Sequence, residues 1–231
     1  MTEFITADAL SALLQVVLID LVLAGDNAVV IALAARNLPA AQQRPAIVLG
    51  SGAAIALRVV LTLFAMQLLQ LPWLKLAGAV MLLWIGIQLL VDSDDAADVR
   101  ARTTLWGAVL TILAADLVMS LDNVIAVAAA ADGAPEGLRL PLLIIGLGLS
   151  IPLIVFGSTL LLKLMQRFPA IVTLGAALLG FVAGELATTD AAARDWFDSH
   201  LHGLDYAVSL SGAIFVVAVG LALSRRTRRE S

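Results

Sequence analysis

Seven long apolar stretches, separated by short breaks rich in proline or polar residues, run along the 231-residue chain. As a helix, each stretch is long enough to cross the roughly 30 Å hydrocarbon core of a bilayer. The first is too long for a signal-peptide core, so we expect it to be retained as a span. The pattern predicts an all-α polytopic membrane protein with seven transmembrane helices, at about 9–35, 45–71, 73–91, 104–131, 140–166, 169–187 and 206–224.

The polar segment 188–205, before the last stretch, has a different pattern. Trp196, Phe197 and His200 recur in it at helical spacing, which predicts an amphipathic helix lying on the outer membrane surface. His200 and His202 could gather a metal ion, but two histidines in a solvated segment more often have no such role.

Composition supports membrane insertion, because 61% of the residues are hydrophobic and only 14% are charged. We therefore expect a lipid bilayer around the chain and no nucleic-acid partner. The absence of cysteine excludes disulfides and thiolate metal sites. No phosphate-binding loop motif is present either, so the chain has no visible machinery for ATP coupling and no expected organic cofactor.

Basic residues are distributed unevenly among the predicted loops. If the N-terminus is outside, ten of the 14 Lys and Arg residues fall in the inner loops and the C-terminal tail. Three fall outside, at Lys75, Arg139 and Arg194. The positive-inside rule then predicts an outer N-terminus and a cytoplasmic C-terminus.

Two of the apolar stretches contain the same acidic motif. DLVLAGDN at residues 20–27 recurs 96 positions later as DLVMSLDN at residues 116–123. An aspartate near the centre of a membrane helix costs roughly 2.5 to 3.5 kcal/mol, so four of them need compensation. A bound cation is the leading candidate, while hydrogen bonding that merely holds the helices together is the structural alternative.

The repeat extends beyond this motif. Gly50-Ser-Gly52 aligns with Gly146-Leu-Gly148 at the same offset, and residues 84–89 align with 181–186 one position further. Each copy is three helices, so the second enters the membrane from the opposite side. We predict a single transmembrane domain with inverted repeats at about 9–91 and 104–187, a cytoplasmic linker at 92–103, the outer segment 188–205, and helix seven at 206–224.

The repeated side chains suggest a metal site near the membrane midplane. Carboxylate and amide oxygens favour hard divalent ions such as Mn²⁺, Mg²⁺ or Ca²⁺. On a regular helix Asp20 and Asn27 share a face, whereas Asp26 points about 120° away. A local break at Ala24-Gly25 would change this. The predicted metal ligands are Asp20, Asp26, Asn27, Asp116, Asp122 and Asn123.

Three further residues are possible accessories to this site. Arg58 is either a counter-ion of the empty site or an anchor that reaches the membrane interface. Glu185 is either a ligand or proton carrier, or an interfacial residue near the outer end of its span. Met119 could add a thioether contact that favours Mn²⁺, although apolar packing is its more common role.

The two acidic motifs resemble those of the TerC family of integral membrane proteins, most closely its YjbE branch, and the resemblance covers essentially the whole chain. It implies a role in Mn²⁺ homeostasis, chiefly export across the bacterial cytoplasmic membrane. It also implies that the conserved acidic residues of the family correspond to the six predicted ligands.

These features predict a secondary transporter that exports Mn²⁺, with Ca²⁺ or Mg²⁺ as other possible cargo. Clustered carboxylates repel one another when the metal leaves, so protons can replace it and exchange becomes possible. The alternatives are a Ca²⁺ transporter, or a membrane scaffold or metal-delivery protein that holds a structural cation and assembles with itself or with other membrane proteins. No nucleophile and base accompany the carboxylates, so we do not expect an enzyme.

Overall fold

The computed structural model describes residues 7–64, 71–91, 104–132, 134, 137–200 and 203–230. Within these residues the chain forms helices joined by turns and contains no strand. The predicted linker 92–103 and His202 lie outside the described part. The helices are α1 (Ala7–Arg36), α2 (Ala40–Leu63), α4 (Leu74–Val91), α6 (Leu105–Asp132), α7 (Arg139–Arg167), α8 (Ala170–Thr188), α9 (Arg194–His200) and α10 (Asp205–Glu230).

Each of the seven predicted apolar stretches contains a helix, but the helix of the second stretch ends at Leu63, before the predicted residue 71, and residues 65–70 lie outside the described part. Five of the helices (α2, α4, α7, α8 and α10) are long and apolar enough to cross a membrane, and α1 makes a sixth if its bent halves form one span. In α6, the apolar helix Leu105–Leu121 is shorter than a full span. The described residues therefore contain five or six candidate spans, and the seventh predicted span stays a prediction.

The second helix begins earlier than its predicted start at residue 45. Pro39 directly precedes its first turn, where the fixed φ of proline is tolerated. The side-chain amide of Gln43 donates to the carbonyl oxygens of Arg36 and Leu38, at 3.2 and 3.1 Å. Gln43 thus connects the first turns of α2 to carbonyl groups at and just after the end of α1.

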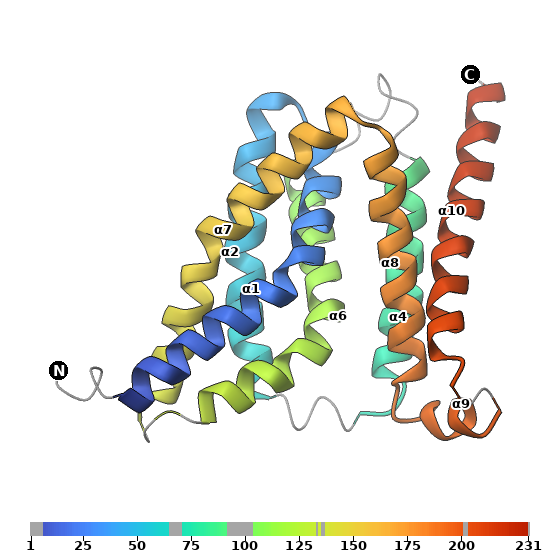
Figure 1. The fold of residues 1–231 in the computed structure, drawn as a ribbon. Coiled ribbons are helices and arrows are strands. Elements are labelled where there is room, and N and C mark those ends of the chain that lie inside the picture. Colours follow the sequence, from blue (N-terminus) through green and yellow to red (C-terminus); the bar gives the residue numbers. More distant parts are fainter. Residues whose placement is uncertain are drawn as a thin grey trace.

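Two groups of helices make up the fold (Figure 1). One group contains α1, α2, α6 and α7, in which α1 packs mainly on α7 and α2 mainly on α6. The other contains α4, α8 and α10, which all pack on one another. Successive long helices run in alternating directions, and α1 begins at the opposite end of the bundle from the end of α10. One hydrophobic core runs through both groups.

Closely approaching helices meet at glycine. A methyl group on Gly50 of α2 would lie 2.5 Å from Ile112 of α6, and one on Gly146 of α7 would lie 2.6 Å from Val16 of α1. The two contacts are equivalent in the sequence repeat, because Gly146 follows Gly50 by 96 positions and Ile112 follows Val16 by the same number. The absence of a side chain at Gly50 and Gly146 therefore sets how near the paired helices can come.

The contact between α8 and α10 is closer still. A methyl group on Gly180 would collide with the backbone carbonyl of Gly212, and one on Gly184 would lie 2.5 Å from Cα of Ser209. Small residues let helix backbones approach one another in a membrane, where packing rather than the hydrophobic effect joins helices. These glycines allow α10 to pack closely against α8.

Helix α1 bends by 49° between its segments Ala9–Asp20 and Gly25–Arg36. The change of direction falls between Asp20 and Gly25, a range that includes the Ala24-Gly25 step, and Figure 1 shows it in the middle of the helix. The backbone remains helical through the bend, so the helix is bent rather than broken. Glycine weakens helix stiffness there because it has no Cβ. The first acidic motif consequently spans a change in helix direction.

The carboxylate of Asp190, in the loop after α8, fixes the beginning of α4. It accepts backbone N–H bonds from Trp73, Lys75 and Leu76 at 3.1, 3.0 and 3.1 Å, and from Ala192 at 2.8 Å. Trp73 has a positive φ of 69°, which is strained for a bulky residue. Asp190 thus caps α4 from the loop after α8 and holds Trp73 in its strained conformation.

Candidate functional site

A buried ionic network joins α1, α2 and α6 inside the first helix group. Arg58 of α2 is only 1% exposed. Its Nη1 donates to Oδ1 of Asp20, and its Nη2 donates to Oδ1 of Asp116 at 2.5 Å. Its Nε donates to the hydroxyl of Ser120 at 3.0 Å, and that hydroxyl donates to Oδ2 of Asp116 at 3.2 Å. All three guanidinium nitrogens therefore have a partner.

The two aspartates of this network hold equivalent positions in the two acidic motifs. Asp20 comes from α1 at the beginning of the bend, and Asp116 comes from α6. Both are buried, at 0% and 6% exposed. The structure therefore brings Asp20 and Asp116 together at Arg58 in the interior.

The other predicted ligands are less completely described. Asp26 is half-buried, and its Oδ1 accepts the backbone N–H of Asn27 at 2.8 Å. It lies within Coulombic range of Arg58 and Asp116. Asn27 is buried, while Asn123 is half-buried. Asp122 belongs to α6, but its side chain is outside the described part.

The charges of this region do not cancel. One guanidinium contacts two carboxylates, those of Asp20 and Asp116, and a third carboxylate, that of Asp26, lies within Coulombic range. Oδ2 of Asp20 is buried and has no hydrogen-bond partner among the described residues. A buried charged oxygen without a partner is costly, so the donor set suits an additional cation. Among the described side chains, however, no three acidic or histidine groups are grouped closely enough to hold a metal ion.

Arg58 itself lies in the position of a counter-ion rather than of an interfacial anchor. The residue is buried at the centre of the network and its head group contacts carboxylates from two other helices. Met119, between Asp116 and Ser120 in the sequence, is buried within the hydrophobic core. That position fits apolar packing, the more common of its two expected roles.

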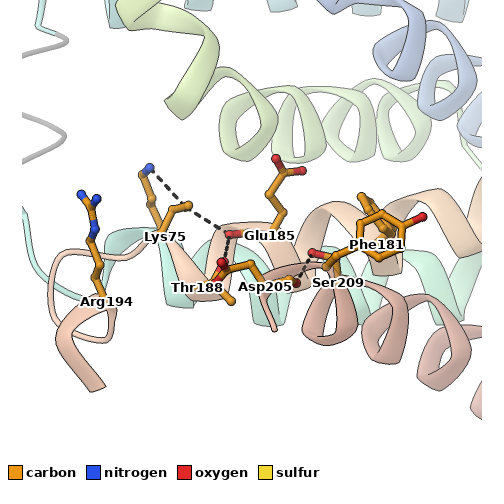
Figure 2. Close-up of a pocket in the computed structure, with 9 residues that line it drawn as sticks. Lys75, Phe181, Glu185, Thr188, Arg194, Asp205 and Ser209 are labelled. Carbon is orange, nitrogen blue, oxygen red and sulfur yellow. Dashed lines mark hydrogen bonds between the residues drawn. The ribbon is translucent and has the colours of Figure 1, made fainter. Parts of the chain in front are cut away.

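Glu185 lies away from the network, in the last turn of α8, and is exposed. It lines a polar cavity of about 590 Å³ together with residues of α4, α9 and α10. Figure 2 shows the charged groups of Glu185, Lys75 and Arg194 extending toward the same side of this cavity. The ammonium of Lys75 donates to the hydroxyl of Thr189 at 3.4 Å. This position fits a residue at the end of a span.

A short helix is present in the predicted outer segment, and its placement on the membrane surface stays a prediction. Helix α9 covers only Arg194–His200 of the segment 188–205. The imidazole of His200 stacks on the indole of Trp196 with ring centres 5.0 Å apart, and its Nδ1 lies 3.0 Å from the carbonyl oxygen of Trp196. These contacts give His200 a local structural role in α9.

Two polar residues gained importance only in the structure. Ser120 lies inside the second motif, four positions after Asp116, so helical spacing could have placed it on the same face. Asp190 follows a helix in a polar loop, and no local pattern shows that its partners lie more than 110 positions earlier, at the start of α4. The sequence therefore contained a local signal for the role of Ser120 but none for the role of Asp190.

Comparison with known proteins places this chain among integral membrane proteins. The family model "Integral membrane protein TerC family" matches residues 5–229. The chain is 45% identical to the membrane protein YjbE of Bacillus subtilis (strain 168) over 183 residues, which cover 79% of this chain and 82% of YjbE. No solved structure gives a significant match.

Two further membrane proteins of Bacillus subtilis (strain 168) are more distant. YceF is 26% identical over 75% of this chain and 69% of its own length. YkoY is 29% identical over 79% of this chain but only 61% of its own length. Since the family model spans almost the entire sequence and YjbE matches most of it, this chain belongs to the TerC family of multi-pass integral membrane proteins.

Proposed function

We propose that this protein is a secondary transporter that exports a divalent cation, with Mn²⁺ as its main substrate, from the bacterial cytoplasm. The observation that carries the proposal is the pairing of Asp20 and Asp116 in the interior, with one buried carboxylate oxygen left unpartnered among the described residues. Buried acids in membrane helices are costly and usually mark an ion pathway. The oxygen donors favour a hard cation, and the choice of Mn²⁺ rests on the family resemblance.

The proposed architecture is a pair of inverted three-helix repeats, 9–91 and 104–187, with α10 as a seventh span. Its support is the antiparallel course of α1 and α6 in Figure 1 and the equivalent glycine contacts of Gly50 and Gly146. Inverted repeats bring equivalent residues together at the membrane midplane. Asp20 and Asp116 would then form one central site from two motifs.

A difference between the repeats supports movement of the two helix groups. Gly78 of α4 lies against Val118 of α6, but its counterpart Gly175 of α8 lies against Val29 and Leu33 of α1. The sequence counterpart of Val118 is residue 22, about two helical turns before Val29. If α4 and α8 exchanged these two modes of packing, the proposed site would open first to one side of the membrane and then to the other.

The proposed direction needs an energy source. Moving a divalent ion out against an inside-negative potential costs about 4.6 kcal/mol per 100 mV, at about 2.3 kcal/mol per charge. Inward movement of protons down their electrochemical gradient would provide it, if protons replace the metal at the carboxylates. Uptake into proteoliposomes, measured with and without a pH gradient at a fixed membrane potential, tests this coupling, and equal rates would exclude proton exchange.

Cellular metal content tests the proposed function. Cells that express the wild type should contain less manganese than cells expressing Asp20→Asn, Asp26→Asn or Asp122→Asn at equal membrane levels. Asp195→Asn, an exposed acid on α9, is the matched control and should behave as wild type. The transporter proposal fails if manganese, calcium and magnesium are all unchanged by the three motif variants.

The scaffold alternative has its own supporting observation. Arg58 already ties three helices together through Asp20, Asp116 and Ser120. Such a network can hold the bundle without any cargo. In that case the Asp26→Asn variant would have the same metal flux as the wild type but would no longer bind a membrane-protein partner. Co-purification with the wild type and with the variant would detect the loss of the partner.

A further inference from the structure

We propose that Arg58 is a tethered cation that occupies the metal site when no metal is bound, so that its guanidinium and the metal ion compete for Asp20 and Asp116. This inference rests on the proposed function and explains how the empty site remains stable. It assigns Arg58 a positioning role in which it sets the affinity of the site.

The first support is the complete engagement of the guanidinium. It contacts Asp20 and Asp116, the two equivalent aspartates of the motifs, and its Nε bonds to Ser120. An arginine stays charged under all ordinary conditions and forms directional bonds in a fixed fork. Its charge therefore stabilises both buried carboxylates continuously in the structure as described.

The second support is that Arg58 leaves part of the site unsatisfied. Oδ2 of Asp20 has no partner among the described residues, and Asp26 adds a third carboxylate within Coulombic range of Arg58. With all three carboxyl groups ionised, these four side chains carry a net charge of −2, which one divalent ion would neutralise.

The third support is that the guanidinium and a metal ion cannot share the two aspartates favourably. A divalent ion bound directly to Asp20 and Asp116 would lie beside the positive guanidinium in a water-poor interior, where like charges repel strongly. Metal entry would therefore separate Arg58 from at least one carboxylate. The proposed separation is a movement of the side chain, since the α2 backbone at this position is helical and its carbonyl accepts the hydroxyl of Thr62 at 2.8 Å.

The repeat contains only one such residue. The counterpart of Arg58 at the 96-residue offset is Ile154, which is buried and apolar. If the ion pairs of Arg58 served only to hold the two repeats together, an equivalent arginine could have been present in the second repeat. One guanidinium shared by two equivalent aspartates instead fits a single central position that either Arg58 or one metal ion fills.

Equilibrium binding of Mn²⁺ to purified protein tests the competition. Arg58→Gln should bind Mn²⁺ at least ten-fold more tightly than the wild type, because the competing cation is gone. It should also unfold at lower temperature in EDTA and regain stability in saturating Mn²⁺, whereas the wild type should shift less. Arg44→Gln, an exposed arginine of the same helix, is the control and should match the wild type in both measurements.

A merely structural role for Arg58 predicts the opposite change, since loss of an organising residue weakens binding. Equal or weaker Mn²⁺ affinity in Arg58→Gln would overturn the inference while leaving the proposed function intact. If Arg58→Gln does not fold, Arg58→Lys replaces it, because an ammonium keeps the charge but loses the fork. Tighter Mn²⁺ binding by Arg58→Lys than by wild type is then expected, and unchanged binding would overturn the inference.

The proposed function fails separately. If neither wild type nor any variant binds or moves Mn²⁺, Mg²⁺ or Ca²⁺, the transporter proposal is wrong and the competition falls with it. If the wild type binds metal and the Arg58 variants bind it equally, only the competition is wrong.

Discussion

The Nε–H of Arg58 donates a 3.0 Å hydrogen bond to the hydroxyl oxygen of Ser120, 62 positions later in the chain. The same hydroxyl donates to Oδ2 of Asp116 at 3.2 Å. Ser120 thereby adds an indirect connection to the direct contact between the guanidinium and Asp116. Both Arg58 and Ser120 are almost completely buried, so no solvent replaces these bonds.

Replacing Ser120 with alanine should destabilise the protein. The substitution leaves a buried guanidinium N–H and a carboxylate oxygen without this partner, at a cost of about 1–3 kcal/mol. Thermal unfolding of the purified protein measures the effect. Ser150→Ala is the matched control, because Ser150 is equally buried and its hydroxyl only reaches the carbonyl of Gly146 in its own helix, at 3.5 Å. Equal melting temperatures for the two variants would contradict the role given to Ser120.

Replacing Gly180 with alanine should disturb the seating of α10. The added methyl group would collide with the carbonyl of Gly212, which belongs to the backbone and cannot rotate away. Overpacking of this kind costs about 1–3 kcal/mol or more. Gly52→Ala is the control, since no heavy atom among the described residues lies within 4 Å of its added methyl group. The interpretation is wrong if Gly52→Ala lowers the melting temperature as much as Gly180→Ala.

The contact between Gly146 and Val16 can be tested by a double-mutant cycle. Gly146→Ala should destabilise the protein by about 1–3 kcal/mol because its methyl group would lie 2.6 Å from Val16. In a Val16→Ala background the same substitution should cost less, because the obstructing side chain is gone. The coupling free energy from four unfolding measurements decides this. Strictly additive effects would mean that the two residues do not limit the approach of α1 and α7.

The carboxylate of Asp190 should make stability depend on pH in the acid range. Burial raises the pKa of Asp190, but the hydrogen bonds from the backbone N–H groups of Ala192, Leu76, Trp73 and Lys75 together lower it by more. The net pKa is therefore below the ordinary value of an aspartate. A carboxyl whose pKa is depressed by folding stabilises the protein above its unfolded-state pKa of about 3.9. That contribution is lost as the pH falls through the folded-state pKa.

Asp190→Asn should therefore lower the stability by about 2 kcal/mol near neutral pH, since an amide N–H₂ group replaces one of the accepting oxygens. The difference from wild type should stay constant from about pH 7 to pH 5 and shrink below about pH 4. Thermal unfolding across this pH range measures it. Asp195→Asn, at an exposed position of α9, controls for loss of a charge, and a difference that persists undiminished below pH 4 would contradict the capping role.

The sequence predicted the helices well because their signal is local. Each apolar stretch must bury or shield its backbone polar groups, and helix formation does this within the stretch itself. Proline likewise acts locally, as at Pro39 and Pro169, where new helices begin. The second helix departs most from its predicted bounds, since it begins at Ala40, before residue 45, and ends at Leu63, before residue 71.

The site was predicted only in part. In the structure the carboxylates of Asp20 and Asp116 both contact Arg58, while their membership of a metal site stays a prediction. The repeated motif singled out these two residues, because inverted repeats are expected to bring equivalent positions together. It left the role of Arg58 open between counter-ion and anchor. That choice depends on how far α2 packs into the space between α1 and α6, which no local pattern contains.

By itself, the sequence determined that this chain is helical, that it belongs in a membrane, and that two equivalent acidic motifs lie within its apolar helices. Hydrophobicity and helical hydrogen bonding act over neighbouring residues, so the order of residues is enough to reveal them. Only the tertiary structure decided that Arg58 lies between Asp20 and Asp116, and that the loop at Asp190 caps α4. These relationships join residues from 38 to 117 positions apart, and their electrostatic energy depends on distances that exist only after the helices have packed.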